Sequence, residues 1–370
     1  MAHRIEVMLL MYAVFFLQRI EIFGTSIGMI VLLALFLVTF FRVLICNQVI
    51  LSRFDALSTY PLFILAFLYG SLFGLGSYTD LVPFVAPAIV WVLFKLNKSW
   101  KLDYFLDSRL LFSILAVLGY YLVLDTISVL NESSGVLKKT FEFSNPNYTG
   151  FLINLLTWIW LLDPKRKWLT SAFFMLFATV AIVMTLSKTA YVIHLLLAVI
   201  FIRKNYILAI ALFSALIIGI VPYITQDGGY LELMLSFFDE DVGDAVGHRA
   251  GLINSALEMA MDNPFFGAGY GNFVEFATRD YGAPLVVKTH NIILTLMAEA
   301  GAVGLLIWLA SQILLFLELN RIKSKFLWIG IAVFYLFSLS HASGEQLSQF
   351  PLILGLIVLV AKNTKINRAR

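Results

Sequence analysis

Long runs of apolar residues, separated by short polar stretches, dominate the pattern along the chain. About 20 apolar residues in a helix cross the hydrocarbon core of a membrane. The runs predict helices at residues 5–17, 23–41, 60–76, 80–95, 110–130, 150–162, 168–186, 189–202, 206–224, 291–318, 326–340 and 351–361. The fold class expected from this pattern is all-α: a polytopic membrane bundle of about 12 transmembrane helices, with residues 1–370 as a single membrane domain.

The composition agrees with a membrane protein. Hydrophobic residues make up 61% of the chain and charged residues 13%, whereas soluble domains have roughly 45–50% and about 25%. A chain with so little polar surface cannot cover a water-facing globule, which excludes a soluble or disordered protein. The single cysteine, Cys46, excludes an internal disulfide and any cysteine-rich metal site. The first apolar stretch lacks a small-residue cleavage site, so no cleavable signal peptide is expected.

The distribution of positive charge predicts the orientation. Twelve crossings place both termini on one side, and 19 of the 26 lysines and arginines fall on that side, against seven on the other. Because cytoplasmic loops are enriched in lysine and arginine, both termini are expected in the cytoplasm.

One large hydrophilic segment, residues 226–289, is inserted between the ninth and tenth expected helices, on the outer side. Within it, residues 246–261 have helical spacing, and an apolar face is expected at Ala250, Ile253, Ala256, Leu257 and Ala260. Such a lone amphipathic helix usually packs against protein or lies on the membrane surface. Asn263-Pro264 should end the helix, and Gly267, Gly269 and Gly271 predict a tight turn.

Lys188 interrupts an apolar run of 35 residues, 168–202. A helix of that length is about 52 Å long, which is too long for one crossing. A split at Ser187-Lys188 leaves a second helix of about 14 residues, or roughly 21 Å, shorter than the hydrocarbon core. Lys188 is therefore expected in a recess below the outer surface. Snorkelling to the headgroups explains the sequence equally well.

Other ionisable residues gather on the outer side. His290 stands where the hydrophilic segment meets helix 291–318, Arg249 lies in the amphipathic helix, and Glu299 lies about two turns into the long helix. A histidine can take a proton from an attacking hydroxyl, and arginine or lysine can hold a diphosphate. Each residue alone is more often structural, but their shared location favours a site.

The remaining histidines and short motifs carry less weight. His248 and His341 also lie outside, whereas His194, mid-helix among leucines, is expected to be a hydrogen-bonded core residue. Asp239-Glu240-Asp241 has the spacing of a metal- and nucleotide-sugar-binding motif, but it faces away from the cytoplasm and is interpreted as a solvated acidic turn. The Gly267 turn lacks dinucleotide-binding spacing, and no zinc-binding spacing occurs.

Four segments, in order, resemble the bacterial O-antigen polymerase and O-antigen ligase superfamily. They are Phe143-Ser144-Asn145-Pro146-Asn147; Ser187-Lys188; Gly247-His248-Arg249-Ala250-Gly251 with Asn263-Pro264-Phe265-Phe266-Gly267-Ala268-Gly269-Tyr270-Gly271-Asn272-Phe273; and Thr289-His290-Asn291 with Ala298-Glu299-Ala300-Gly301. The resemblance covers roughly residues 140–310 and is fairly specific to the superfamily. It does not separate polymerase from ligase.

The resemblance implies a metal-independent, cofactor-free C-type glycosyltransferase whose donor is a glycan on undecaprenyl diphosphate. By position, the resemblance implies that Arg249 would bind the diphosphate and that His290 would activate the acceptor hydroxyl or assist at the phosphate. Lys188 stands where the family usually has arginine, which keeps the charge but loses the forked geometry. Supporting residues are expected among His248, Asn291, Glu299, His341 and Glu345.

Three functions remain open from the sequence. The first is an O-antigen or exopolysaccharide polymerase that joins lipid-linked repeat units, and the second is a ligase that transfers the glycan to lipid A-core. The third, a lipid-linked oligosaccharide flippase or transporter, would be expected to have paired interrupted helices and is disfavoured. The expected partners are the lipid-linked donor, a glycan acceptor, membrane lipid, a chain-length regulator and a flippase, and no nucleic acid.

Overall fold

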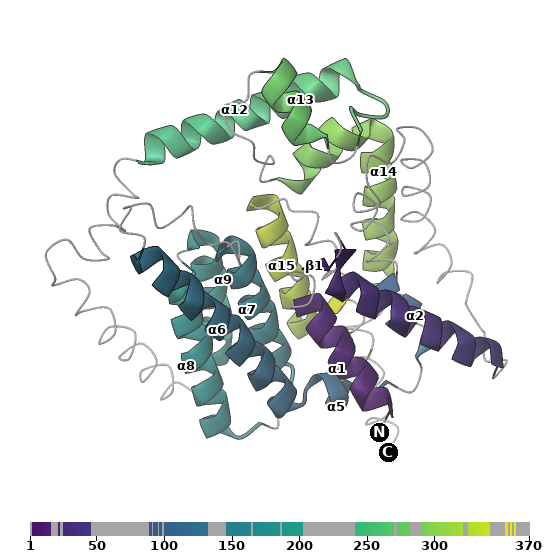
Figure 1. Cartoon of the computed structure of the whole chain (residues 1–370), viewed down its shortest axis with the longest axis vertical. Helices are drawn as coiled ribbons and strands as arrows, with labels where there is room; N and C mark the ends of the chain where they lie inside the picture. Colours follow the sequence, from purple (N-terminus) through teal and green to yellow (C-terminus); the bar gives the residue numbers. More distant parts are fainter. Residues whose placement is uncertain are drawn as a thin grey trace, which may run out of the picture.

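The computed structural model is almost entirely helical where it describes the chain (Figure 1). The described residues are 2–15, 21–22, 25–45, 89–90, 92–94, 96–97, 100–131, 146–163, 166–185, 187–202, 241–269, 272–281, 291–320, 325–340, 352, 353, 356 and 359. Their one small sheet pairs β1 (Glu21–Ile22) with β2 (Thr25–Ser26) in antiparallel register. The all-α class is confirmed for this part of the chain.

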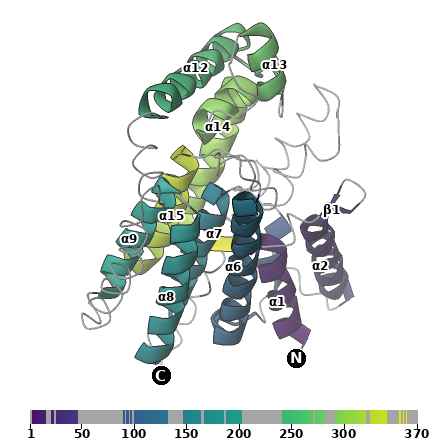
Figure 2. The same ribbon diagram turned by 60° about the vertical axis from the view of Figure 1, so that its left-hand side comes forward.

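Most of the helices form a bundle, and two lie across one end of it (Figures 1 and 2). The bundle helices are α1 (Ala2–Phe15), α2 (Ile27–Ile45), α5 (Leu102–Phe105), α6 (Ser108–Asn131), α7 (Pro146–Leu161), α8 (Trp168–Met184), α9 (Lys188–Ile202), α14 (Ile292–Asn320) and α15 (Lys325–Ser340). The other two are α12 (Asp241–Asp262) and α13 (Phe273–Asp280). Residues 241–269 and 272–281 are called the α12–α13 unit below.

α7 forms the centre of the bundle. All its residues from 148 to 160 are buried, because α6, α8, α9 and α15 pack around it. A helix that is apolar all round belongs in such a position. Trp160 stacks on Phe174 of α8 with ring centroids 4.0 Å apart, and Phe151 stacks on Phe337 of α15 at 4.6 Å.

Cations that the sequence assigns to the cytoplasm share one end of the bundle. Arg4 forms an ion pair with Asp107, which precedes α6, and the Arg166 guanidinium donates to the Leu106 carbonyl. Burial lowers the pKa of Arg166 to about 10, and the Asp163 carboxylate, 3.4 Å away, opposes that shift. Because this lowered pKa is still well above 7, Arg166 stays charged at neutral pH.

The same end holds a buried carboxylate. Glu6 of α1 forms an ion pair with Arg42 near the end of α2. Trp100 donates to Glu6 Oε2 through its indole Nε1 at 3.1 Å. α1, α2 and the segment before α5 are therefore held together at this end. The α12–α13 unit lies at the opposite end from the start of α1 (Figure 2).

The helix prediction is confirmed in part. Residues 102–124 and 292–310 are long and apolar enough to cross a membrane. The split of the run 168–202 is confirmed, because α8 ends at Met184 and α9 begins at Lys188. The expected helices 60–76 and 206–224 lie outside the described residues, and those at 80–95 and 351–361 lie largely outside them. The count of twelve crossings therefore stays a prediction.

Two expectations were wrong in detail. Residues 291–318 were expected as one continuous helix, but α14 breaks at Gly301, which has non-helical dihedral angles. The amphipathic helix is present and longer than expected, but its buried face is rotated toward Leu252, Ser255, Ala256 and Met259, and Ile253 is 38% exposed. The rotation follows from packing, because α12 contacts α14 and α13 on that face.

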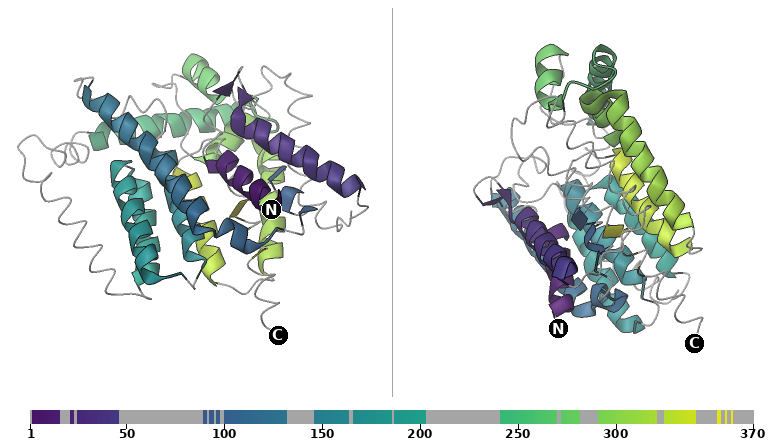
Figure 3. Two further views of the ribbon diagram at one scale, coloured as in Figure 1. Left: turned by 60° about the horizontal axis from the view of Figure 1, so that its bottom comes forward. Right: turned by 90° about the vertical axis from the view of Figure 1, so that its right-hand side faces the viewer.

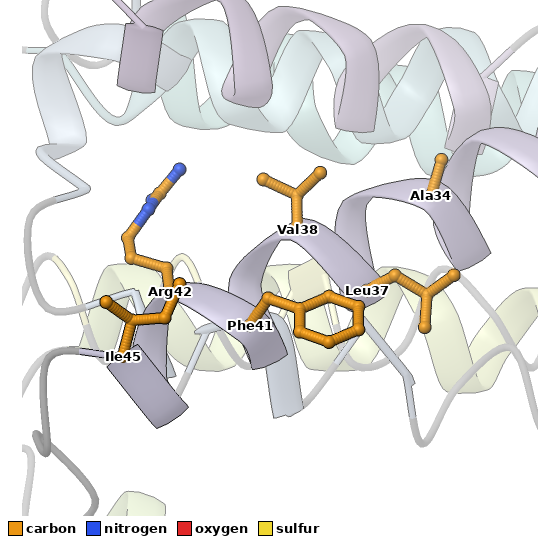
Figure 4. A pocket seen from close by; sticks show the side chains of 6 residues that line it. All are labelled: Ala34, Leu37, Val38, Phe41, Arg42 and Ile45. Carbon is orange, nitrogen blue, oxygen red and sulfur yellow. The ribbon is translucent and has the colours of Figure 1, made fainter.

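An open apolar groove of about 720 Å³ runs along α2 (Figure 4). The lining residues that the structure describes all come from this helix: Ala34, Leu37, Val38, Phe41, Arg42 and Ile45. None of them is a site residue expected from the sequence.

Close packing of α15 on α7 can be tested at Gly330. A Cβ at this position would lie 2.4 Å from the Trp158 ring, so the helices would have to separate. We expect Gly330→Ala to lower the free energy of unfolding by about 1–3 kcal/mol, measured by thermal unfolding in detergent. Gly119 of α6 is the matched control, since nothing lies within 4 Å of its Cβ position. Equal stability of both variants would contradict the packing described for Gly330.

Candidate functional site

α8 and α9 meet at a short, buried corner that contains the Ser-Lys motif. Ser187 precedes α9, and its Oγ accepts from the backbone N–H of Ala190 at 3.3 Å. Serine is a favoured residue at this position because it satisfies a free N–H of the first helical turn. Lys188 is therefore the first residue of α9, where the positive end of the helix dipole adds to its charge.

The corner packs on the first turns of α7. A Cβ on Gly150 would lie 2.5 Å from the Ala190 Cβ and 3.3 Å from Thr185 Oγ1, so only glycine permits this approach. Pro146 is the first residue of α7, a position at which its missing N–H has no helical partner to lose. Pro146-Asn147 and Lys188, about 40 residues apart in the sequence, thus belong to contacting helices.

A series of hydrogen-bonded polar side chains lies beside this corner, inside the bundle. Asn154 donates to the Ala190 carbonyl through Nδ2 at 2.9 Å, so its Oδ1 is the atom 3.0 Å from His194 Nδ1. His194 Nδ1 then donates to Asn154, and His194 Nε2 lies 3.0 Å from Thr179 Oγ1, whose hydroxyl donates to the Met175 carbonyl at 2.7 Å. The expectation that His194 is a hydrogen-bonded core residue is confirmed.

The break in α14 is filled by backbone groups of the loop after α12. Gly301 has φ 60° and ψ −169°, a region open essentially only to glycine. The segment before it ends with the carbonyls of Ala298 and Glu299, which accept from the backbone N–H groups of Ala268 and Gly269 at 2.9 and 3.0 Å. Helix ends leave such groups without intrahelical partners, and the loop supplies them.

After the break, α14 donates hydrogen bonds to the loop instead of accepting them. The N–H groups of Ala302 and Val303 donate to the carbonyls of Pro264 and Phe265 at 2.8 and 3.1 Å. The loop therefore satisfies both ends of the interruption, and residues 264–269 are joined to α14 through four backbone hydrogen bonds.

Two glycines make this docking possible. A Cβ on Gly267 would lie 2.3 Å from the Glu299 carbonyl carbon, and a Cβ on Gly301 would lie 2.5 Å from that of Phe265. Gly267 and Gly269 have positive φ, as expected for a turn, and Gly271 lies outside the described residues. The sequence predicted the turn but not that it contacts α14. The glycine at position 301, within a long apolar run, was the sequence feature that could have indicated a break in that helix.

Glu299 and Asn291 hold the backbone around this junction. Glu299 is fully buried, and its Oε1 accepts from the backbone N–H of Phe273 at the start of α13, 3.1 Å away. Asn291 Oδ1 accepts from the N–H groups of Ile293 and Leu294 at 2.9 and 3.2 Å, which caps the start of α14. His290 immediately precedes this cap in the sequence.

α12 is fastened over the same junction. Its Leu252, Ala256 and Met259 form an apolar cluster with Phe273, Ala277 and Ala298 of α13 and α14. At its end, Asp262 accepts from the Tyr281 hydroxyl at 2.7 Å, a bond that raises the pKa of Tyr281 to about 12. These contacts fix the helix that carries Arg249 relative to the start of α14.

The predicted site residues fall into three groups. Asn291 and Glu299 are described with their side chains. Lys188, His248 and Arg249 are placed by backbone on α9 and α12, whereas His290, His341 and Glu345 lie outside the described residues. In the part of the chain that the structure describes, no cluster of three His, Cys, Asp or Glu residues could hold a metal ion.

The described parts of the four sequence segments fall into two pairs. Pro146-Asn147 and Lys188 lie on contacting helices, α7 and α9, and the loop motif docks into α14, the helix that follows His290 in the sequence. α15 links the two pairs, since it contacts α7, α9 and α14. Convergence of Lys188, Arg249 and His290 around one chamber stays a prediction.

The part of the chain that contains the α8–α9 corner and the docked loop is similar to a family of membrane-integral, glycosyltransferase-like enzymes. Residues 172–309 match the model of the O-antigen ligase family, which confirms the resemblance to the O-antigen polymerase and ligase superfamily. The match begins in α8 and ends in α14, so it includes the α8–α9 corner and the junction at Gly301. No curated protein matches the chain.

The Glu299 bond to α13 predicts a local effect. Hydrogen bonds to charged groups contribute about 1.5–3 kcal/mol, so Glu299→Ala should speed amide exchange in residues 268–281 by about 10- to 100-fold. Glu299→Gln keeps an accepting oxygen and should retain most of the protection. Hydrogen-exchange mass spectrometry of the protein in detergent measures both.

Glu275→Ala provides the control for the loss of a carboxylate. Glu275 is exposed on α13, and its contact is a surface ion pair with Arg279 at 3.5 Å, so its removal should leave exchange unchanged. Unaltered protection in Glu299→Ala would show that the buried carboxylate does not hold α13.

Proposed function

We propose that the protein is an O-antigen or exopolysaccharide polymerase. It joins oligosaccharide repeat units carried on undecaprenyl diphosphate and releases undecaprenyl diphosphate. The family match over residues 172–309 carries this proposal, and the docking of the motif loop into α14 supports it, because two of the segments that carry the resemblance contact each other there. The description of the matched family favours an O-antigen ligase, which transfers the glycan to lipid A-core, as the second candidate.

The break in α14 argues against a transporter. In transporters, unwound helices present free backbone groups to substrates or ions. Here the carbonyls of Ala298 and Glu299 and the N–H groups of Ala302 and Val303 are bonded to residues 264–269. The interruption therefore serves as an attachment point for the loop.

The proposed reaction is a single displacement. The acceptor hydroxyl oxygen bonds to the anomeric carbon of the donor sugar, and the bond from that carbon to the diphosphate oxygen breaks. His290 takes the hydroxyl proton, and Arg249 and Lys188 stabilise the charge that develops on the departing diphosphate. Because the diphosphate is already an activated leaving group, the step needs neither a metal nor a nucleotide.

The placement of the helices supports these roles. Lys188 occupies the first turn of α9, where backbone N–H groups and the helix dipole favour a phosphate. Arg249 lies on a helix packed against α14, and Asn291 caps the helix that directly follows His290. His248, His341 and Glu345 complete the proposed polar surroundings.

The proposed orientation places the α12–α13 unit in the periplasm. Arg4, Arg42 and Arg166 are bonded at the other end of the bundle, as expected for the cytoplasmic side of a bacterial inner membrane. Both termini would then be cytoplasmic. A chain-length regulator and a flippase are the proposed protein partners.

Substitution of the proposed catalytic residues tests the mechanism. Arg249→Ala should reduce glycan transfer by about 10²–10³-fold, and His290→Ala by about 10²–10⁴-fold, while both proteins still insert in the membrane. Transfer is measured with purified protein and lipid-linked oligosaccharide, followed by electrophoresis of the product. Lys188→Arg should retain activity and Lys188→Ala should lose most of it.

Arg279→Ala is the matched control for charge removal in the α12–α13 unit. Arg279 is exposed, and Asp280 and Glu275 raise its pKa without any proposed contact to substrate. Its loss should leave transfer unchanged. Normal product from Arg249→Ala or His290→Ala would remove that residue from the mechanism.

Polysaccharide from a deletion strain separates the two candidate functions. A polymerase predicts loss of the polymer ladder with one repeat unit left on the core. A ligase predicts unsubstituted core and long chains retained on the carrier lipid. Unchanged polysaccharide would contradict both.

A further inference from the structure

The loop that docks into α14 carries exposed apolar side chains. Phe265 is 68% exposed and Phe266 is 49% exposed, and Met261, at the end of α12, is 71% exposed. Large apolar side chains grouped in this way on a surface mark an interaction site. Their position relative to α14 indicates the partner.

The length of α14 sets the height of this group relative to the membrane. From Ala302 to Asn320 the helix has 19 residues, about 28 Å at 1.5 Å per residue, which matches the roughly 30 Å hydrocarbon core. Arg321, Lys323 and Lys325 follow directly, as expected beyond the cytoplasmic boundary. The apolar stretch 292–310 contains the break at Gly301, so we take the unbroken segment 302–320 as the crossing, and Gly301 then falls at the outer boundary of the hydrocarbon.

Backbone bonds fix the loop at that boundary. The Phe265 carbonyl accepts from Val303 in the first turn after the break, and the Pro264 carbonyl accepts from Ala302. The side chains of Phe265 and Phe266 thus belong to the level of the first turn of the membrane segment. The right-hand view in Figure 3 shows α14 running from the α12–α13 unit along the bundle.

An exposed stripe on α14 continues from this level toward the other end of the helix. Ala302, Leu306, Leu309 and Ile313 are exposed and spaced four, three and four residues apart, so they share one helix face. An apolar face of this length on a membrane segment contacts acyl chains. The stripe begins at the residue whose N–H is bonded to the loop.

We propose that Phe265, Phe266 and Met261 insert in the outer-leaflet interface and anchor the α12–α13 unit to the bilayer. Aromatic and large apolar side chains stabilise protein segments at the boundary between headgroups and acyl chains. The anchor does not depend on which glycan-transfer reaction the protein performs.

Site-specific labelling tests the anchor. Since the chain has one cysteine, Cys46, the Cys46→Ser protein accepts a single new cysteine for an environment-sensitive nitrobenzoxadiazole label. The test variants are Phe265→Cys and Phe266→Cys. Leu306→Cys, 64% exposed on the α14 stripe, is the lipid-facing reference, and Thr278→Cys, exposed on α13, is the water-facing reference. The proteins are reconstituted in phosphatidylethanolamine–phosphatidylglycerol vesicles at no more than one protein each.

Spin-labelled phosphatidylcholine in the vesicles then quenches labels that contact lipid. We expect quenching at positions 265 and 266 to exceed that at position 278 by about threefold or more, and to be stronger with a quencher near the headgroup than with one at the bilayer centre. Each variant must elute as the parent protein on size exclusion, and either phenylalanine position suffices if the other variant misfolds.

Two results would overturn the proposal. Water-like emission and quenching equal to position 278 would place the loop away from the membrane. Blue-shifted emission that appears only at several proteins per vesicle, without lipid quenching, would identify the surface as a contact between copies of this chain.

Discussion

The arrangement described here depends on four backbone hydrogen bonds at the break in α14. Residues 264–269 supply both the donors for Ala298 and Glu299 and the acceptors for Ala302 and Val303. Each group left without a partner in this buried junction would cost about 1–3 kcal/mol. The docked loop therefore removes the main energetic penalty of interrupting a helix, and the interruption in turn gives the loop a fixed place. The buried Glu299 carboxylate extends the junction to α13.

The junction determines where the proposed site residues can lie. α12 carries Arg249 and packs on α14 and α13, while Asn291 caps the helix that follows His290. Two segments separated by about 40 residues are thus held in one unit by backbone bonds and a small apolar cluster. The α8–α9 corner, which ends at Lys188, is instead stabilised by side chains inside the bundle. These are the close contact at Gly150 and the polar contacts between Asn154, His194 and Thr179.

Features that depend on local sequence could be predicted. The apolar run 168–202 is too long for one crossing, and the serine and lysine at 187 and 188 show where it divides. A histidine among leucines indicated the core role of His194, and helical spacing indicated α12. Features that depend on a distant partner were not predicted. Gly301 marks a place where the helix could break, but the sequence around it does not identify the loop that docks there. The buried face of α12 depends on the position of α13 and α14, which leaves Ile253 exposed.

The loop is attached to α14 by backbone hydrogen bonds, and this affects how the protein is assembled in the cell. Residues 264–269 leave the ribosome more than 30 positions before Val303, the last of the four α14 residues that bond to them. α12 and its loop must therefore be synthesised, and under the proposed orientation translocated, before their binding partner exists. A nascent chain that stops short of residue 303 lacks part of the α14 backbone that bonds to residues 264–269. The loop can therefore dock fully only after the tenth predicted crossing has been synthesised.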